Sequence, residues 1–332
     1  MCSPTDRTDV TAAVRRTAAF GWVALIVGCL SAAAHACPKT GYSVVELPFL
    51  PQVISSDGVV AGITKAHRAV VWRRDSGVRE LTVPEGFHYT DPVGFTSRGD
   101  VVVNATDARA KKHGAFVYSK TSLVALAGNQ TLAHGVSPTG LIVGEWVPKD
   151  NSRNEPVYWR NSEPHALAGC CGGTLKASNR RGELVGDAYD AQGRYHAFAW
   201  SPASGRRSVG PAGSFSSAVA VDAAGAILLQ VGSEGYLDRG GQLQRLQLSS
   251  KPYNNLRAMS DCDFVVGGYG TDSDHYRAFL WTPASGFQDL NSLLPRDSGW
   301  TLEEAVAINN RGEIVDRGDF EHDDEGFLLI PR

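Results

Sequence analysis

The stretch SNRRGELVGDAYDAQGRYHAFAWSPASG, residues 178–205, contains the pattern that decides the fold. A polar turn that ends at Gly182 precedes the apolar run Leu184–Val185, and a second apolar run ends at Trp200, five residues before Gly205. Short runs of aliphatic and aromatic residues, separated by turn residues, indicate β-strands. The stretch therefore predicts consecutive short strands joined by tight turns.

The same pattern recurs seven times, at intervals of about 42 residues. The first turn of each unit ends at Gly58, Gly99, Gly140, Gly182, Gly225, Asp263 and Gly312. The second apolar run ends in an aromatic residue at Trp72, Tyr118, Trp159, Trp200 and Trp281, whereas the fifth unit is degenerate. In the fourth unit the turn is placed at Ser178–Gly182, one residue longer than the others. Each unit predicts four short strands.

Four short antiparallel strands repeated at this interval are typical of one blade of a β-propeller. We therefore predict an all-β fold, a seven-bladed β-propeller of four-stranded antiparallel blades. The last unit ends after its third strand, Gly326–Ile330, and Tyr42–Leu47 offers the missing strand. The N-terminal strand is thus expected to close the last blade. A β-solenoid is the alternative, but its open ends would not explain this arrangement.

Glycine is frequent, with 36 residues in 332, and the repeat accounts for many of them. Besides the first-turn positions, Gly77, Gly205 and Gly286 are expected to close the last turn of a unit. Second strands are expected to end at Gly62, Gly144, Gly186 and Gly267. Tight turns and strand ends need the backbone freedom of glycine.

Residues 1–36 are predicted to be a secretory signal peptide, which leaves residues 37–332 as a single β-propeller domain. Arg15 and Arg16 precede an uncharged apolar stretch that ends with the small residues Ala34 and Ala36. The expected location is secreted or periplasmic, with no transmembrane span after cleavage. The alternatives are a single membrane anchor, for which the stretch is short, and a lipoprotein with a lipid anchor at Cys29.

The composition excludes several classes of protein. Charged residues make up 20% and hydrophobic residues 42% of the chain, which is typical of a globular protein and not of a disordered chain or a multi-span membrane protein. A formal net charge of -3, without a long basic run, argues against nucleic acid as a partner.

The repeat resembles the HAF repeat, or probable extracellular repeat, family of bacteria. The best match is Arg181–Gly186 followed by His196–Trp200, and the two halves of the motif also occur at Ile308–Val315 and Arg277–Trp281, with Arg277 in place of histidine. The resemblance covers about residues 41–332. It implies export and a propeller-like fold, and it brings no reaction or ligand that can be transferred to particular residues.

In a propeller of this strand order, the turns between the first and second strands and between the third and fourth strands lie on one face, the tight-turn face. The other connections lie on the opposite face, the long-loop face, where longer and more varied loops are expected to carry binding. Candidate ligand-binding residues there are His88, Asp91, His134, Trp146, Tyr189 and Trp300. For Trp146 and Trp300, packing between blades is the alternative.

No motif predicts a catalytic residue, a metal site or a cofactor. Histidines recur just before third strands, so they are expected to contact local groups and not a substrate; they are His67, His113, His196 and His275. The acidic segment Asp319–Glu325 is expected to be a solvated loop on the long-loop face.

Four cysteines follow the predicted signal peptide and are candidates for disulfides: Cys37, Cys170, Cys171 and Cys262. Cys170 and Cys171 are placed on the long-loop face, whereas Cys37 and Cys262 are placed on the tight-turn face. We therefore expect a strained vicinal Cys170–Cys171 bridge or two free thiols. Cys37 and Cys262 are paired only if the loops allow it.

These observations favour a binding or interaction module whose partner is an extracellular or periplasmic glycan or protein. The alternative is a glycan-active hydrolase or lyase, in which Asp91, Glu303 and Glu304 meet at the mouth of the central channel. A third hypothesis is a structural protein of the cell envelope without a small ligand. Binding is favoured over catalysis because the chain has shaped loops but no catalytic motif.

Overall fold

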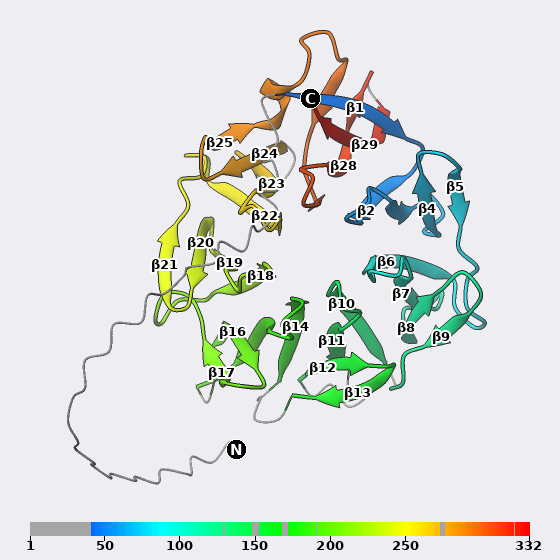
Figure 1. The fold of residues 1–332 in the computed structure, drawn as a ribbon, viewed down its shortest axis with the longest axis vertical. Coiled ribbons are helices and arrows are strands. Elements are labelled where there is room, and N and C mark those ends of the chain that lie inside the picture. Colours follow the sequence, from blue (N-terminus) through cyan, green and yellow to red (C-terminus); the bar gives the residue numbers. More distant parts are fainter. Residues whose placement is uncertain are drawn as a thin grey trace, which may run out of the picture.

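The computed structural model describes residues 41–128, 130–147, 153–167, 172–190, 192–272, 276–321 and 323–332. These residues form seven antiparallel sheets in a ring, which confirms the predicted seven-bladed β-propeller (Figure 1). Within these ranges the one helix is a short 3-10 turn, η1 (Leu290–Leu293), between blades 6 and 7. The predicted signal peptide, residues 1–36, lies outside the described residues.

Each of blades 1 to 6 takes four consecutive strands, ordered from the centre of the ring outward. Blade 1 contains β2 (Leu50–Ile54), β3 (Val60–Ile63), β4 (Ala69–Arg73) and β5 (Gly77–Glu80). Blade 2 contains β6 (Tyr89–Phe95), β7 (Val101–Thr106), β8 (His113–Tyr118) and β9 (Leu123–Ala125). Blade 3 contains β10 (Thr131–Val136), β11 (Ile142–Trp146), β12 (Glu155–Arg160) and β13 (Glu163–Ala166).

The second half of the ring follows the same order. Blade 4 contains β14 (Gly173–Ser178), β15 (Leu184–Tyr189), β16 (Tyr195–Ser201) and β17 (Gly205–Ser208). Blade 5 contains β18 (Ser217–Val221), β19 (Ile227–Val231), β20 (Glu234–Arg239) and β21 (Gln242–Arg245). Blade 6 contains β22 (Tyr253–Met259), β23 (Val265–Gly270), β24 (Tyr276–Thr282) and β25 (Gly286–Asp289). Blade 7 contains β26 (Trp300–Leu302), β27 (Ala307–Ile308), β28 (Ile314–Phe320), β29 (Asp323–Pro331) and β1 (Tyr42–Leu47).

Blade 7 closes the ring through its outermost strand, β1. This strand pairs antiparallel with β29, with Tyr42 opposite Pro331 and Leu47 opposite Gly326. In Figure 1 the blue β1 lies beside the red β29. The inner strand of the blade is divided into β26 and β27, and both pair with β28. The predicted closure by the N-terminal strand is therefore confirmed.

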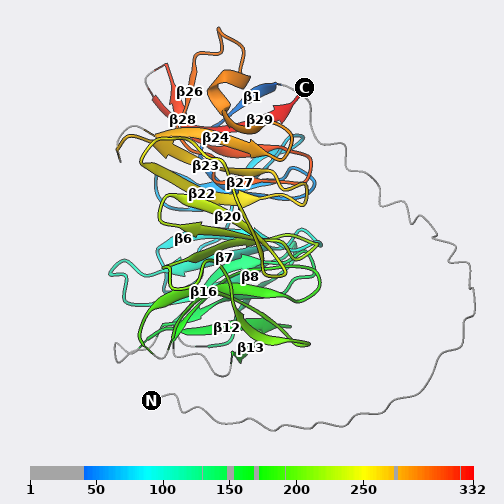
Figure 2. The same cartoon turned by 90° about the vertical axis from the view of Figure 1, so that its left-hand side faces the viewer.

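The hydrophobic core of the described residues consists of seven clusters, and each lies mainly between two neighbouring blades. Figure 2 shows the ring of blades edge-on. Between blades 3 and 4, for example, Val143 belongs to the same cluster as Leu175 and Phe198. Blade 5 contributes to the clusters on both of its sides through Ile227 and Leu228. The degenerate fifth unit is therefore a full blade, because its buried positions stay aliphatic.

All seven turns between the first and second strands have the same backbone hydrogen bonds. In blade 1 the N–H of Ser55 donates to the carbonyl of Val59, and the N–H of Gly58 donates to the carbonyl of Ser55. The first turn residue is always Ser, Thr, Asn or Asp, and its side-chain oxygen accepts from the N–H four residues later. The fourth residue of the turn has a positive φ in every unit, which favours glycine, although Asp263 adopts it too (φ 58°).

The placement of the fourth turn was wrong by one residue. The N–H of Gly182 donates to the carbonyl of Asn179, so the turn runs from Asn179 to Gly182, and Ser178 is the last residue of β14. The carboxamide oxygen of Asn179 accepts from the N–H of Glu183, as the hydroxyl of Ser55 does in blade 1. The turn therefore has the same length as the other six.

The inner strands of blades 1 to 6 share an irregularity, and in four of these blades a glycine of the second strand lies beside it. In blade 4 the pairing of β14 with β15 shifts between Leu175 and Ala177. A Cβ on Gly186 would collide with the backbone carbonyl oxygen of Thr174. The same constraint applies to Gly62, Gly144 and Gly267. The prediction that these glycines end strands was wrong: they lie inside strands and leave room for the neighbouring backbone.

Gly186→Ala is expected to destabilise the protein by about 3 kcal/mol, because two strands must separate to admit the methyl group. Gly205→Ala is the matched control. Gly205 has a φ of 65°, but no atom lies within 4 Å of a Cβ built there. Only backbone strain of about 1 kcal/mol is expected for the control. Urea unfolding of both variants measures the difference, and equal losses would contradict the explanation.

Candidate functional site

The two faces of the ring differ as predicted. Every turn between a first and a second strand contains five residues, and those between third and fourth strands contain two to four. On the long-loop face the connections vary from two residues, between β19 and β20, to ten residues, between β25 and β26. Variation in loop length on a rigid scaffold is typical of a binding face.

The most exposed aromatic residues of the described chain lie on the long-loop face. Phe215 is 70% exposed, Tyr253 49% and Tyr89 42%. Tyr89 and Tyr253 begin inner strands, and Phe215 lies in the loop before β18. The large exposed aliphatic residues lie instead on the outermost strands, at Val78, Leu123, Val124 and Leu243. Strong aromatic exposure is therefore confined to one face of the described structure.

A cleft of about 310 Å³ lies on the same face, between blades 3 and 4. Tyr189 and Tyr195 face each other across β15 and β16, with ring centroids 4.8 Å apart and planes tilted by 58°. The guanidinium carbon of Arg153 lies 4.1 Å from the centroid of the Tyr189 ring. Asn154 and Thr174 add polar side chains to the lining. The cleft therefore combines aromatic rings with hydrogen-bonding groups.

Thr174 connects this cleft to a buried carboxylate. Its hydroxyl donates to Glu145, which is 7% exposed, and Nε2 of His134 lies 3.4 Å from the other carboxylate oxygen. Burial opposes ionisation of Glu145, but hydrogen bonds from His134 and Thr174 outweigh burial and lower its pKa. Burial and the charge of Asp187 raise the pKa of Tyr195 to about 12. Tyr195 therefore presents a neutral hydroxyl.

Other polar side chains on second strands hold neighbouring blades together. The Nδ2 group of Asn104 donates to the carbonyl of Ala133 at 2.8 Å, and its Oδ1 accepts from the N–H of the same residue at 2.9 Å. Equivalent side-chain acceptors bind the next inner strand at two further positions, Asp187 to Ala218 and Gln230 to Leu256. Asp187 also pairs with Lys176. These groups have structural partners and are not free to react.

The structure brings His134 and Tyr189 to the site between blades 3 and 4. Trp146 follows Glu145 in β11, but its indole packs against the hydrophobic cluster between blades 2 and 3. Trp300 stacks on Phe320 with ring centroids 5.0 Å apart. Packing, the alternative for both tryptophans, accounts for their positions. A binding role for the six candidate residues stays a prediction.

His88 and Asp91 form a separate group at blade 2. The Nδ1 atom of His88 accepts from the N–H of Ala108 at 3.2 Å. Burial raises the pKa of the Asp91 carboxyl, while His67 and Gln52 of blade 1 act in the opposite direction. This half-buried carboxylate lies in a different sector of the ring from the cleft between blades 3 and 4.

Four side chains that line the cleft were missed by the sequence reasoning. Tyr195 could have been found, because the predicted pairing of the second and third strands places it opposite Tyr189. Arg153 and Asn154 come from the loop before β12, where no periodic pattern marks a residue. Thr174 lies near the start of an inner strand, where no residue pattern marks it as part of a site.

The three carboxylates of the enzyme hypothesis belong to separate groups. Glu304 accepts from Nε of Arg257 at 2.6 Å. Glu303 lies 3.9 Å from Arg317. Asp91 is on blade 2 and is influenced by blade 1. Glu303 and Glu304 therefore have cationic neighbours on blades 6 and 7, whereas Asp91 lies on blade 2.

Two of the recurrent histidines make the local contacts expected of them. Nε2 of His196 lies 2.9 Å from the carboxylate of Asp190, and Nδ1 of His113 lies 3.4 Å from the hydroxyl of Thr106. His275 lies outside the described residues.

The acidic segment Asp319–Glu325 was wrongly placed in a loop. Strands β28 and β29 continue into it, with Phe320 opposite Asp323, so it is the tip of a hairpin held by strand pairing. In the described part of the chain, no three His, Cys, Asp or Glu side chains converge as metal ligands would.

The candidate disulfides are not decided by the described residues, since Cys37, Cys170 and Cys171 lie outside them. Cys262 is half-buried in the first turn of blade 6, where it packs against the cluster between blades 6 and 7. Its N–H donates to the hydroxyl of Ser260 at 3.3 Å.

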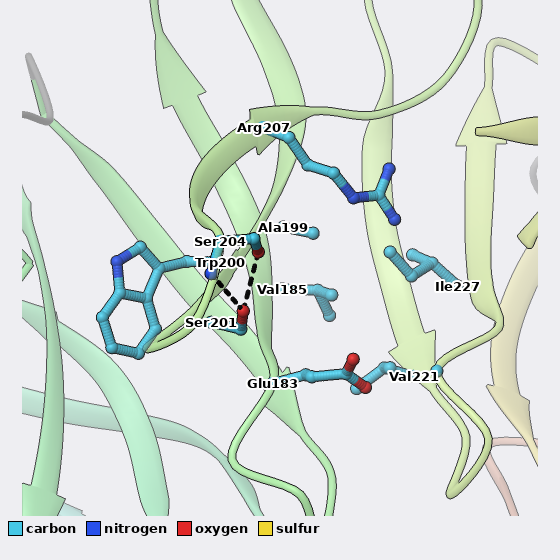
Figure 3. A pocket seen from close by; sticks show the side chains of 10 residues that line it. Glu183, Val185, Ala199, Trp200, Ser201, Ser204, Arg207, Val221 and Ile227 are labelled. Atoms are coloured by element: carbon cyan, nitrogen blue, oxygen red, sulfur yellow. Dashed lines mark hydrogen bonds between the residues drawn. The ribbon is translucent and has the colours of Figure 1, made fainter. Parts of the chain in front are cut away.

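A small pocket between blades 4 and 5 is not a ligand site. Figure 3 shows its lining, in which Glu183 of blade 4 approaches Val221 of blade 5 and Ser201 binds Ser204. Its volume of about 40 Å³ has room only for water, since small-molecule sites usually measure roughly 300 to 1,000 Å³.

No protein-family model matches the sequence, and no curated protein matches it either. Solved structures of the same fold include virginiamycin B lyase from Staphylococcus aureus, with 14% identity and a TM-score of 0.55 over 88% of this chain and 100% of that one. Oligogalacturonate lyase in complex with manganese has 10% identity and a TM-score of 0.57 over 88% and 91%. The WD40 β-propeller domain of Doa1 has 12% identity and a TM-score of 0.54 over 89% and 98%.

These similarities establish the fold alone, because propellers with different activities share it. In the described residues no helix is long and apolar enough to span a membrane.

Proposed function

We propose that the protein is a glycan-binding β-propeller whose long-loop face contacts the sugar. The observation that carries the proposal is the confinement of Phe215, Tyr253 and Tyr89 to this face, with 42% to 70% of each residue exposed. Sugar rings pack their C–H faces on aromatic rings. This contact buries a large apolar surface, while the hydroxyl of a tyrosine can still form a hydrogen bond. The three exposed aromatic residues lie at blades 2, 5 and 6, a spacing that fits an extended ligand better than a single small one.

The cleft between blades 3 and 4 supplies the polar contacts that such a ligand requires. Arg153, Asn154 and the neutral hydroxyl of Tyr195 offer hydrogen-bond donors beside the Tyr189 ring. A few placed polar groups among aromatic side chains give a binding site its orientation and specificity. The cleft therefore recognises sugar hydroxyls while the exposed aromatic residues add contact area.

We further infer that the chain is exported and works outside the cytoplasm as a member of the HAF repeat family. Support comes from the signal-peptide pattern of residues 1–36 and from the match of His196–Trp200 to the repeat. A lipid anchor at Cys29 is the alternative form of attachment. A secreted or periplasmic location would expose the long-loop face to envelope glycans.

A glycan hydrolase or lyase is supported less well, although two similar structures are lyases. Acid–base cleavage of a sugar needs a carboxyl pair that the substrate can touch. Glu304 is engaged by Arg257, and Asp91 lies on another blade. Binding without bond cleavage therefore agrees best with the arrangement of charges.

The proposal is tested with the triple variant Tyr89→Ala/Phe215→Ala/Tyr253→Ala. Its glycan affinity is expected to fall about ten-fold or more, which corresponds to roughly 1.4 kcal/mol. The matched control Val78→Ala/Val124→Ala/Leu243→Ala removes three exposed apolar side chains from outermost strands and is expected to bind normally. Glycan and peptide arrays identify the ligand, and isothermal titration calorimetry measures its affinity.

Two results would overturn this function. If the wild type binds peptides and no glycan, the partner is a protein. If both triple variants bind a glycan equally well, the exposed aromatic residues do not form the site.

A further inference from the structure

A large cavity lies at the opposite end of the channel, on the tight-turn face. It has a volume of about 760 Å³, well within the range of small-molecule sites. Its mouth is formed by the first turns of five blades, including Ser56, Ser97, Pro138, Arg180 and Asn310. The cavity therefore shares no lining residue with the cleft between blades 3 and 4.

The wall of this cavity is apolar and is formed by inner strands. Its side chains come from six different blades: Val53, Val93, Val136, Ala177, Ala258 and Ala307. The channel is wide here because Gly94 and Gly135 also stand in the wall. Lys176 directly precedes Ala177, and Arg257 directly precedes Ala258. These longer polar side chains line no part of the cavity. Small apolar side chains thus form the wall of this cavity.

The rim of the cavity is cationic. Arg73, Arg98, Lys120 and Arg180 line it, against one carboxylate, Asp57. Arg98 pairs with Asp100 at 3.3 Å and Arg180 with Asp261 at 3.8 Å. No carboxylate of the described residues lies within ion-pair distance of Arg73 or Lys120, and both side chains are exposed.

The unpaired cations lie at one sector of the rim. Arg73 ends β4 of blade 1, and its guanidinium approaches Gly99 in the first turn of blade 2. Lys120 lies in the turn between β8 and β9 of the same blade 2. Their charges therefore act on the same side of the cavity, where an anion would neutralise them.

We propose that this cavity binds a small organic anion with an apolar body. The alkyl or aryl part lies among the valines and alanines of the channel, and the carboxylate, sulfonate or phosphate group lies at Arg73 and Lys120. The combination of an apolar wall with a cationic rim carries the proposal. The wall buries the apolar body of the ligand, and the rim neutralises its charged group. The site is separate from the proposed glycan-binding face and does not depend on it.

Matched ligands test both halves of the proposed site. Decanoate below its micellar concentration is expected to bind one molecule per chain by isothermal titration calorimetry. Decanol, with the same tail and no charge, is expected to bind about ten-fold more weakly, and acetate, with the charge and no tail, is expected not to bind measurably. Equal affinity for decanoate and decanol, or no saturable binding of decanoate, would overturn the proposal.

Charge variants locate the anion. Arg73→Glu/Lys120→Glu is expected to weaken decanoate binding about ten-fold or more and to leave decanol binding unchanged. Arg73→Gln/Lys120→Gln removes the charges without repulsion and is expected to give a smaller loss. The control Lys65→Glu/Lys251→Glu makes the same change in net charge at exposed lysines on the long-loop side and is expected to bind normally. Equal effects of the control and the rim variants would show a general charge effect and reject the site.

Discussion

A chain that begins at Pro48, and so lacks β1, is expected to lose cooperative unfolding. Tyr42 and Leu47 are 3% and 0% exposed, and they belong to the clusters between blades 6 and 7 and between blades 7 and 1. Removing these two side chains alone forfeits about 5 kcal/mol of burial. The unfolding free energy of a typical domain is only about 5 to 15 kcal/mol, so the ring should open.

The matched control is a chain that begins at Gly41 and keeps β1. It is expected to melt like the full-length protein, whereas the chain from Pro48 is expected to melt broadly at much lower temperature. The truncated chain should also aggregate, because β29 becomes an unpaired edge strand. Circular dichroism and light scattering during heating measure both effects. Melting of the two truncated chains within a few degrees of each other would show that pairing of β1 with β29 does not hold the ring closed.

The ring could be predicted from the sequence because its information is local and repeated. Each first turn needs a side-chain acceptor at its first residue and a positive φ at its fourth, so Ser55 and Gly58 mark the same points as Asn309 and Gly312. Even Asp263, which breaks the glycine pattern, takes the expected conformation. Blade count and closure follow from counting these turns and the strands left over at the two ends.

The candidate sites were less predictable because they depend on irregular backbone. The register shift in the inner strands of blades 1 to 6 changes which side chains face the channel after it, and no residue type marks it within those strands. Ala258, which follows such a shift, therefore had no recognisable signal. The cationic mouth on the tight-turn face was also missed, since short turns suggested a face without function, whereas small wall residues such as Gly135 make the cavity.

Blade 7 departs from the other blades at one buried carboxylate. Asp316 occupies the position that Gly186 has in blade 4, and the inner strand opposite is interrupted between β26 and β27. The interruption makes room for a side chain that the continuous strand of blade 4 would exclude. Asp316 is 6% exposed, and its Oδ2 atom has no hydrogen-bond partner among the described residues.

Burial, with a further contribution from the charge of Glu304, raises the pKa of Asp316 to about 8, although Arg317 and Arg257 act in the opposite direction. In the unfolded chain this carboxyl has an ordinary pKa near 3.8. Between these two values the folded state holds a proton that the unfolded state has lost. The unfolding free energy therefore falls as the pH rises from about 4 to 8, by about 1.4 kcal/mol per pH unit from this group.

Asp316→Asn is expected to remove this loss of stability. The variant should come within about 1 kcal/mol of the wild type at pH 4, where Asp316 is neutral in the fold and only partly ionised in the unfolded chain, and should exceed it by several kcal/mol at pH 8. Asp190→Asn is the control, for which the change in unfolding free energy at pH 8 should have the opposite sign. Partial burial disfavours its charge, but hydrogen bonds from the Arg194 backbone, His196 and the Arg194 side chain outweigh this and lower the pKa of Asp190, so its removal should cost stability at pH 8. Urea unfolding across this pH range measures both variants, and parallel curves for wild type and Asp316→Asn would show that this carboxyl titrates normally in the fold.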